Sequence, residues 1–369
     1  MRHALFALAL AAAFPACAAE LVVHEWGTIT SVHAGSGTPR GALNKIDVAD
    51  VLPDFVHRYE PEQTRHDPAR RFAKSPLVPG RPDVTMRLET PVIYFHPPAG
   101  GKFETPIDVE VKFRGGILNE YYPAADAGLA VDFPRIEEKR EAGVLPREWN
   151  FEILNEYVVG SLKWRGVRIH DTVIAPLTDN PVWLAPREVQ AGSVFVPEAG
   201  EGERYLFYRG VANLEALLQT RTSTGAVRIA APHVLTWLEA PAITLPAVWL
   251  ADIRVDGLVA FREHGPVTIT RAKPDAELGS LRRFSTGDYQ AEGVKLLRAS
   301  LRRALLAQGL YADEAEAMLN TWKASWFGKP GLRVFYVVPR EWTDHFLPLT
   351  VSVPARMNRA IVGRIDLAP

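Results

Sequence analysis

The chain has 369 residues, of which 47% are hydrophobic, and its 42 basic and 43 acidic residues give a formal net charge of −1. Because this balance creates no global field that would attract a polyanion, the composition argues against a nucleic-acid partner or an anionic membrane surface. The hydrophobic content is sufficient for packed cores, and the length predicts two or three domains.

Residues 1–19 are typical of a secretory signal peptide. Arg2 provides a basic start, an apolar stretch runs from Leu5 to Phe14, and small residues lead to Ala19. The apolar stretch is shorter than the roughly 20 residues that a membrane-spanning helix needs, and no later segment of the sequence approaches that length. We therefore expect a protein with no transmembrane segment that is exported through a Sec-type pathway and is periplasmic or secreted.

Cys17 is the single cysteine of the chain. Cleavage after Ala18 or Ala19 removes it, so the mature protein is predicted to be cysteine-free, without a disulfide, a thiolate metal site or a thiol nucleophile. Lipid attachment at Cys17 is the minor alternative, because the preceding residues lack the leucine that such sites usually carry.

Residues 20–185 are predicted to form a β-sandwich-like domain. Short β-branched and aromatic runs are separated by proline and glycine, which is typical of strands. Apolar residues at 109, 111 and 113 alternate with charged residues at 108, 110 and 112, which indicates a strand with one buried and one wet face. Two Pro-rich stretches, at about 61–82 and 176–202, interrupt this pattern, and the second is interpreted as a domain linker.

A second β domain is predicted over residues 203–272, and its clearest signal is Asp256-Gly257 between two apolar runs, which predicts a hairpin. From residue 288 the apolar period becomes helical, with Leu297 and Leu301 in one stripe that Gly309 ends. Residues 288–369 are therefore predicted to form an αα-hairpin followed by β-strands. The expected fold is mainly β with this C-terminal hairpin, and α+β overall.

The pentapeptide ILNEY occurs twice, around Glu120 and Glu156, which raises the hypothesis of a two-carboxylate glycosidase. Retaining enzymes of that kind hold their two carboxyl groups roughly 5–5.5 Å apart. The Asn-Glu signature belongs to TIM barrels, however, and this sequence lacks the alternation of strands and helices that such a barrel requires. The repeat is interpreted as a coincidence or as two similar strand ends.

Glu120 is nevertheless a candidate catalytic residue, because Tyr121 and Tyr122 follow it and a carboxylate beside aromatic rings resembles a sugar-binding edge. Tyr121, Tyr122 and Arg209 are the candidate ligand-binding residues, since the guanidinium of Arg209 could clamp a carboxylate. The alternative is structural: tyrosines that pack on the core and an arginine that ends its strand with a salt bridge.

The segment LVVHEWGT places His24 beside Glu25 near the mature N-terminus. Glu25 is the second candidate catalytic carboxylate, and His24 is the candidate metal ligand if a metal is bound. In one continuous strand His24 and His33 point to opposite faces, so the two require a bulge or turn to share an ion. No HExxH-like spacing supports a zinc site, so no cofactor is predicted, although a divalent metal is not excluded.

Glu341 and His345 lie four residues apart and would share one face of a helix. A histidine oriented by a carboxylate is a candidate general base, and the alternative is an exposed helix contact.

The motifs HEWGT, ETPVIYF, ILNEYYP, YLFYRGV, TWKASWF and VFYVVPR together resemble those of an uncharacterised family of bacterial exported proteins. The resemblance covers most of the mature chain and implies a shared fold. It implies no activity, cofactor or catalytic residue.

Two functions are therefore hypothesised from the sequence. The first is a non-catalytic protein that binds an envelope glycan, a peptide or a protein partner, because the sequence has no nucleophile elbow, P-loop or dinucleotide-binding motif. The alternative is a hydrolase that acts on an envelope or extracellular polymer. In that case Glu120 and either Glu25 or His24 would converge in a cleft between domains.

Overall fold

The computed structural model describes residues 20–37, 39–41, 43, 52–59, 84–98, 103–143 and 157–368. The expected signal peptide with Cys17, the Pro-rich stretch at 61–82 and Glu156 of the second ILNEY lie outside the described residues. Among the helices of the described part, none combines the length and the apolar character that crossing a membrane requires.

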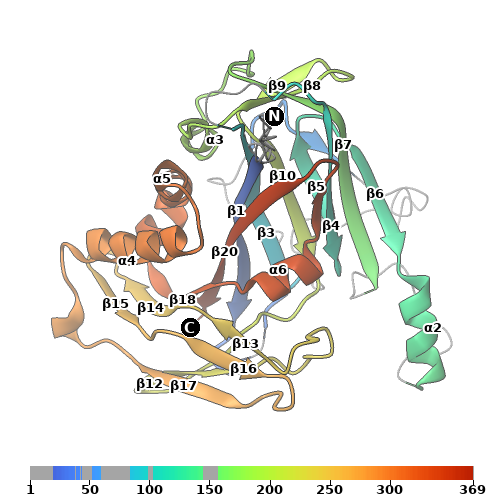
Figure 1. The fold of residues 1–369 in the computed structure, drawn as a ribbon. Coiled ribbons are helices and arrows are strands. Elements are labelled where there is room, and N and C mark those ends of the chain that lie inside the picture. The colour runs from blue at the N-terminus through green and yellow to red at the C-terminus, as the bar shows by residue number, and fades with distance from the viewer. Residues whose placement is uncertain are drawn as a thin grey trace, which may run out of the picture.

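A nine-stranded sheet is the largest element of the described chain, and it is called the main sheet below (Figure 1). In order across this sheet its strands are β15 (Val259–Glu263), β14 (Val248–Ile253), β18 (Gly331–Val337), β20 (Ala355–Leu367), β1 (Leu21–His33), β3 (Met86–His96), β10 (Leu206–Ala212), β5 (Gly116–Tyr122) and β2 (His57–Arg58). The central strand β1 is parallel to β20 and antiparallel to β3. The three predicted segments 20–185, 203–272 and 288–369 all contribute strands to this one sheet.

Three smaller sheets complete the β structure of the described residues. The largest of them contains β19 (Leu349–Val351), β4 (Ile107–Arg114), β7 (Val158–His170), β8 (Ser193–Val196) and β9 (Glu201–Glu203), with β6 (Asp126–Val131) paired to β7. The other two consist of β11 (Gln219–Thr222), β12 (Ala226–Ala230) and β17 (Glu277–Arg282), and of β13 (Ala242–Leu245) and β16 (Val267–Thr270).

Helical segments are few in the described chain. They are α2 (Phe133–Glu141), α3 (Pro181–Arg187), η3 (Thr286–Asp288), α4 (Gly293–Ala307), α5 (Ala312–Thr321), the π-helical η4 (Lys323–Gly328) and α6 (Arg340–Phe346). The mainly β fold with a C-terminal αα-hairpin is thus confirmed, with α4 and α5 as the hairpin. The predicted turn at Asp256-Gly257 is confirmed too, because β14 pairs antiparallel with β15 and Gly257 has a φ of +83°.

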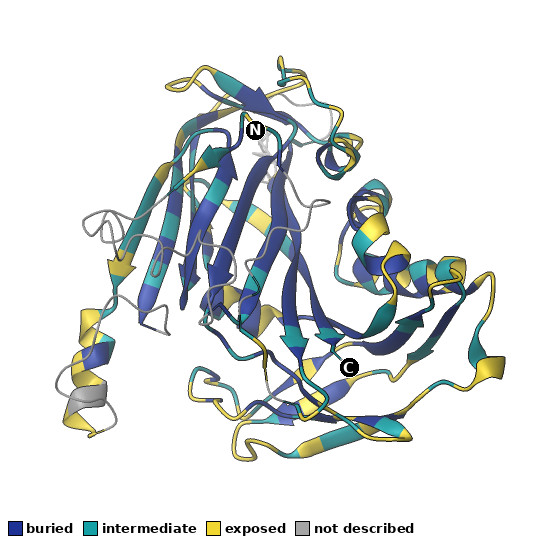
Figure 2. Ribbon diagram, turned by 180° about the vertical axis from the view of Figure 1, so that it is seen from behind, coloured by how far each residue is buried: buried dark blue, intermediate teal, exposed yellow. Residues whose placement is uncertain are grey.

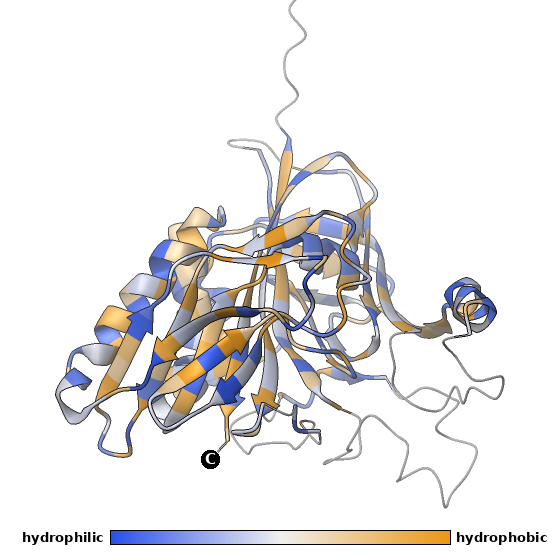
Figure 3. Ribbon diagram, turned by 90° about the horizontal axis from the view of Figure 1, so that it is seen from below, coloured by the Kyte–Doolittle hydropathy of each residue, from blue (hydrophilic) through white to orange (hydrophobic). Residues whose placement is uncertain are grey.

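Two hydrophobic cores cover the two faces of the main sheet. One face packs against β4 and β7, where Ile29 and Phe95 share a core with Phe113 and Trp164. The opposite face, called the helical face below, packs against α3, α4, α5 and η4. Figure 2 shows the resulting burial along the central strands, and Figure 3 shows apolar and polar residues intermixed along the ribbons.

The strand β1 explains this arrangement locally. Its residues alternate between the two faces, with Val23 in one core and Trp26 in the other, and nearly every position is buried. A strand covered on both faces carries apolar side chains in both directions, so polar residues such as His24 and Glu25 must find partners inside the protein.

Candidate functional site

His24, His96 and Glu314 form a buried cluster at one end of the helical face. His24 comes from β1, His96 is the last residue of β3, and Glu314 lies in the first turn of α5. One nitrogen or oxygen atom of each side chain lies within 4.8 Å of the others. His24 and Glu314 have no exposed surface, and the side chain of His96 is 10% exposed.

Hydrogen bonds connect the three side chains. Glu314 Oε2 lies 2.6 Å from His24 Nδ1, and Glu314 Oε1 lies 3.0 Å from His96 Nε2. The backbone N–H of Tyr311 donates to Glu314 Oε2 over 2.7 Å and closes the capping box that begins α5. Glu314 therefore begins the helix and joins it to two strands of the main sheet.

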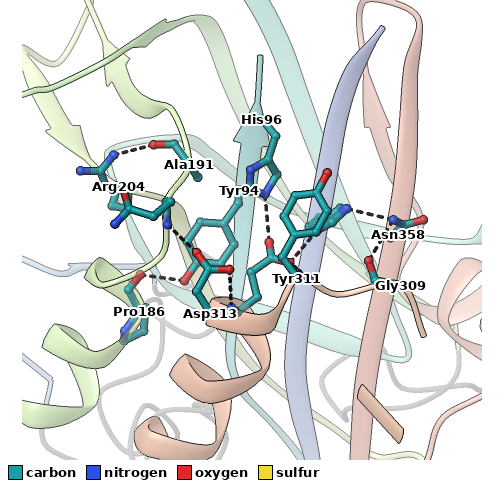
Figure 4. A network of polar contacts seen from close by, with 12 residues as sticks. Tyr94, His96, Pro186, Ala191, Arg204, Gly309, Tyr311, Asp313 and Asn358 are labelled. Atoms are coloured by element: carbon teal, nitrogen blue, oxygen red, sulfur yellow. Dashed lines mark hydrogen bonds and ion pairs between the residues drawn. The ribbon is translucent and has the colours of Figure 1, made fainter. Parts of the chain in front are cut away.

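Asn358 fixes the orientation of the His24 ring. The amide nitrogen of Asn358 donates to the carbonyl of Gly309 over 3.2 Å and lies 2.9 Å from His24 Nε2. Because this nitrogen is a donor, His24 accepts at Nε2 and donates from Nδ1 to Glu314. Figure 4 shows Asn358 and Gly309 at one side of the cluster.

Tyr311 covers the cluster on its outer side. Its ring centroid lies 4.6 Å from that of His24 and 4.8 Å from that of His96, and the residue is 42% exposed (Figure 4). The three polar groups therefore lie one aromatic ring below the protein surface.

The pKa of Glu314 is set by two opposing effects. Burial raises the pKa of this carboxyl, but hydrogen bonds from His24, His96 and the Tyr311 N–H lower it to about 2. Glu314 is thus a carboxylate over the whole physiological pH range, which is the form that binds a cation.

The cluster has the composition of a transition-metal site. Two imidazole nitrogens and one carboxylate are a ligand set that zinc accepts at about 2.0–2.2 Å, with a fourth position left open. Ligands around such an ion lie about 3.4 Å apart, so the His24 and Glu314 atoms, now at 2.6 Å, would have to separate slightly. His24 would also have to release its Nδ1 proton, since a metal ligand needs a free lone pair.

Of the residues predicted from the sequence, His24 lies in this cluster and Glu25 does not. The carboxylate of Glu25 is fully buried, 2.6 Å from Arg359 Nη2, and it accepts a hydrogen bond of 2.5 Å from the Tyr208 hydroxyl. Glu25 and Tyr208 point away from the helical face, because Tyr208 belongs to the core shared with β4 and β7.

Glu120 lies on the helical face in β5, which β10 separates from β3, the strand of His96. It is paired with Arg58 at 3.6 Å and with Arg209 at 3.9 Å, and its side chain is 20% exposed. Arg209 and Tyr208 are consecutive residues of β10, so their partners Glu120 and Glu25 lie on opposite faces of the main sheet. The structure therefore does not bring these two carboxylates together.

Tyr121 and Tyr122 are also divided between the two faces. Tyr121 belongs to the core shared with β4 and β7, whereas Tyr122 packs among Phe55 and Trp183 on the helical face. The ring of His57 stacks near both tyrosines, with centroids at 5.7 and 6.0 Å. The two rings thus do not form one flat binding platform.

Two further histidines lie elsewhere, of which His33 is buried and His345 is half-buried. His33 Nδ1 lies 2.8 Å from the Thr220 hydroxyl, and burial lowers its pKa to about 4. His345 in α6 packs against Trp237 with ring centroids 5.8 Å apart, and burial lowers its pKa, while Glu341 is exposed.

His96 and Glu314 were not predicted from the sequence. His96 could have been found only by pairing β1 with β3, where Val22 lies opposite His96 and His24 lies opposite Tyr94, so that the two histidines are diagonal neighbours. Glu314 is visible in the sequence only as one of two acidic residues in the first turn of a predicted helix, which indicates a helix start and no ligand. Comparison with known proteins adds no candidate, since no family profile matches the chain and no curated protein is significantly similar to it.

Proposed function

We propose that the protein is an exported metal-binding protein that holds one divalent transition-metal ion, best matched by zinc, between His24, His96 and Glu314. The observation that carries the proposal is the convergence of two imidazoles and one carboxylate, from elements up to 290 residues apart, within 4.8 Å. Imidazole and carboxylate together favour zinc over calcium, which prefers a shell of oxygen atoms.

A purely structural role would use the same three residues differently. As a hydrogen-bonded network, Glu314 joins the start of α5 to β1 and β3 and satisfies both histidines. This role predicts that substitutions lower stability equally with and without metal. A metal site predicts that zinc raises stability and that the substitutions remove this increase.

The experiment is isothermal titration of the metal-free mature protein with zinc, with calcium as the comparison ion. We expect one zinc per chain and little heat from calcium. His96→Gln should weaken zinc binding at least 100-fold, because removing a ligand has a larger effect than the 10- to 100-fold loss seen for supporting residues. His96 is the best position to change, since its side chain is the most exposed of the three.

His33→Gln is the matched control, since His33 is a buried histidine of β1, the strand of His24, and contacts Thr220 instead. It should leave the zinc titration unchanged. If zinc did not bind stoichiometrically, or if His96→Gln bound it as tightly as the wild type, the cluster would be a structural network and the proposal would be wrong.

Metal-assisted hydrolysis is the second candidate function. Three protein ligands leave a fourth position for a water molecule, as in single-zinc hydrolases, and the side chain of His96 is partly exposed beside Tyr311. Zinc-dependent cleavage of an activated ester that is absent in His96→Gln would support it. An envelope glycan, a peptide or a protein as the ligand stays a prediction.

A further inference from the structure

Several buried atoms between the main sheet and its helical layer have no hydrogen-bond partner among the described residues. Arg333 Nε and Asp366 Oδ1 form an ion pair at 3.6 Å, and six others lack an ion-pair partner too. They are Trp26 Nε1, Thr28 Oγ1, Arg364 Nε, Arg364 Nη1, Trp322 Nε1 and Trp326 Nε1. All six can donate a hydrogen bond. Because a buried donor without an acceptor is unfavourable, such a group of donors indicates a bound partner rich in acceptors.

Three of the donor side chains share one face of two neighbouring strands. In the parallel register of β1 and β20, Trp26 lies opposite Ala360, Thr28 opposite Val362, and Thr30 opposite Arg364. Paired residues of adjacent strands point to the same side of a sheet, and Trp26, Ala360 and Val362 belong to the core of the helical face. Thr28 and Arg364 therefore point into this layer as well.

The two tryptophans of the helical layer lie over the same part of the sheet. The ring of Trp326 packs against Phe335 with centroids 5.1 Å apart, and Phe335 lies opposite Arg364 in the pairing of β18 with β20. Trp322 is stacked on Trp326 at 6.3 Å. Donors from the sheet and donors from its cover thus occur together.

The acidic groups near Arg364 are already paired with arginines, although Asp366 Oδ1 accepts no hydrogen bond and lies 3.6 Å from Arg333 Nε. Arg364 Nη2 donates to Asp366 over 2.9 Å, and Arg364 is 8% exposed. Glu89, which also attracts the Arg364 charge, accepts the Thr30 hydroxyl over 2.9 Å and lies 3.3 Å from Arg87 Nε. Arg364 Nε and Nη1 are therefore left for another acceptor.

We infer that this layer binds the oxyanion group of a small ligand, a carboxylate or a phosphate, through Arg364, Thr28 and Trp26. A guanidinium group matches the paired oxygens of either oxyanion, and it repels a cation. Water would bring donors of its own, whereas an oxyanion brings acceptors only. This site involves none of the three residues of the proposed metal centre, so either proposal can fail alone.

The test is thermal unfolding of the metal-free mature protein with a chelator present, in sodium phosphate, sodium acetate and sodium chloride of equal ionic strength. We expect phosphate or acetate to raise Tm by about 2 °C or more over chloride, since a ligand that binds only the folded state stabilises it. Phosphate and acetate distinguish the two oxyanion classes.

Thr28→Val is the informative variant, because it removes the unpartnered hydroxyl and keeps the shape of the side chain. It should fold as well as the wild type in chloride, since it removes a buried unpaired group, and it should reduce the oxyanion shift by half or more. Trp26→Phe removes the N–H donor together with part of a buried ring, so it should lower Tm in chloride, and it should reduce the oxyanion shift as Thr28→Val does.

Matched controls exist for both variants. Thr321→Val removes a buried hydroxyl that donates to Ala317, and Trp164→Phe removes an N–H that donates to Pro123. Both controls should keep the full oxyanion shift. The proposal would be overturned if neither anion raised Tm above chloride, or if Thr28→Val and Trp26→Phe kept the wild-type shift.

Discussion

The replacement of Glu25 by glutamine tests whether this residue is structural. Its carboxylate accepts hydrogen bonds from Arg359 Nε at 2.7 Å and from the Tyr208 hydroxyl, and it lies 2.6 Å from Arg359 Nη2. Neither Glu25 nor Arg359 has more than 2% of its side chain exposed. Glutamine keeps the shape but removes the charge, so Arg359 would lose its buried counter-charge.

The size of the effect follows from the burial of the pair. Removing one partner of a buried ion pair typically costs about 3–5 kcal/mol, and two unit charges 4 Å apart interact by about 4 kcal/mol at an effective dielectric constant of 20. Arg359 Nη1 retains Asp344 at 3.1 Å, but that carboxylate is 48% exposed. We therefore expect a loss near the lower limit, about 3 kcal/mol.

Urea unfolding at pH 7, followed by tryptophan fluorescence, measures this loss as a shift of the midpoint. Arg359→Met should destabilise the Glu25→Gln protein less than it destabilises the wild type, because only in the wild type does it leave a buried carboxylate unpaired. A loss below about 1 kcal/mol for Glu25→Gln, the value of an exposed pair, would refute the reasoning.

Three further predictions concern other described residues. Glu120→Gln should change the free energy of unfolding by less than about 1 kcal/mol in the same urea assay, because its pairs are long and partly exposed. Burial lowers the His33 pKa from 6.5 to about 4. Between these two pH values the unfolded chain binds a proton that the folded protein does not, so the free energy of unfolding falls by about 3 kcal/mol as the pH drops from 6.5 toward 4. The free energy of unfolding, measured by urea across that pH range, should therefore fall less steeply for His33→Gln than for the wild type. An unchanged slope would contradict the lowered pKa of His33. Gly363→Ala should destabilise by about 3 kcal/mol or more, because its Cβ would overlap the Tyr336 ring. Differential scanning calorimetry measures this loss, and Gly225→Ala is the control that should show little change, because its Cβ would meet no atom within 4 Å.

The secondary structure was largely determined by local sequence patterns. The alternation at residues 107–113 became β4, the leucine stripe became the buried side of α4, and Asp256-Gly257 became a hairpin turn. Each of these signals lies within a few residues of one element or turn. It can therefore be recognised without knowing what that element packs against.

The candidate site was decided by the tertiary structure. The sequence indicates His24, but its partners His96 and Glu314 join it only because β3 pairs beside β1 and α5 docks on that face. Likewise, the sequence shows Glu25 as a polar residue in a strand, whereas its burial depends on β4 and β7 covering the second face of the sheet. Local patterns specify which residues share a face of one element, but which elements meet is set by the packing of both faces of the main sheet, and that packing joins segments nearly 300 residues apart.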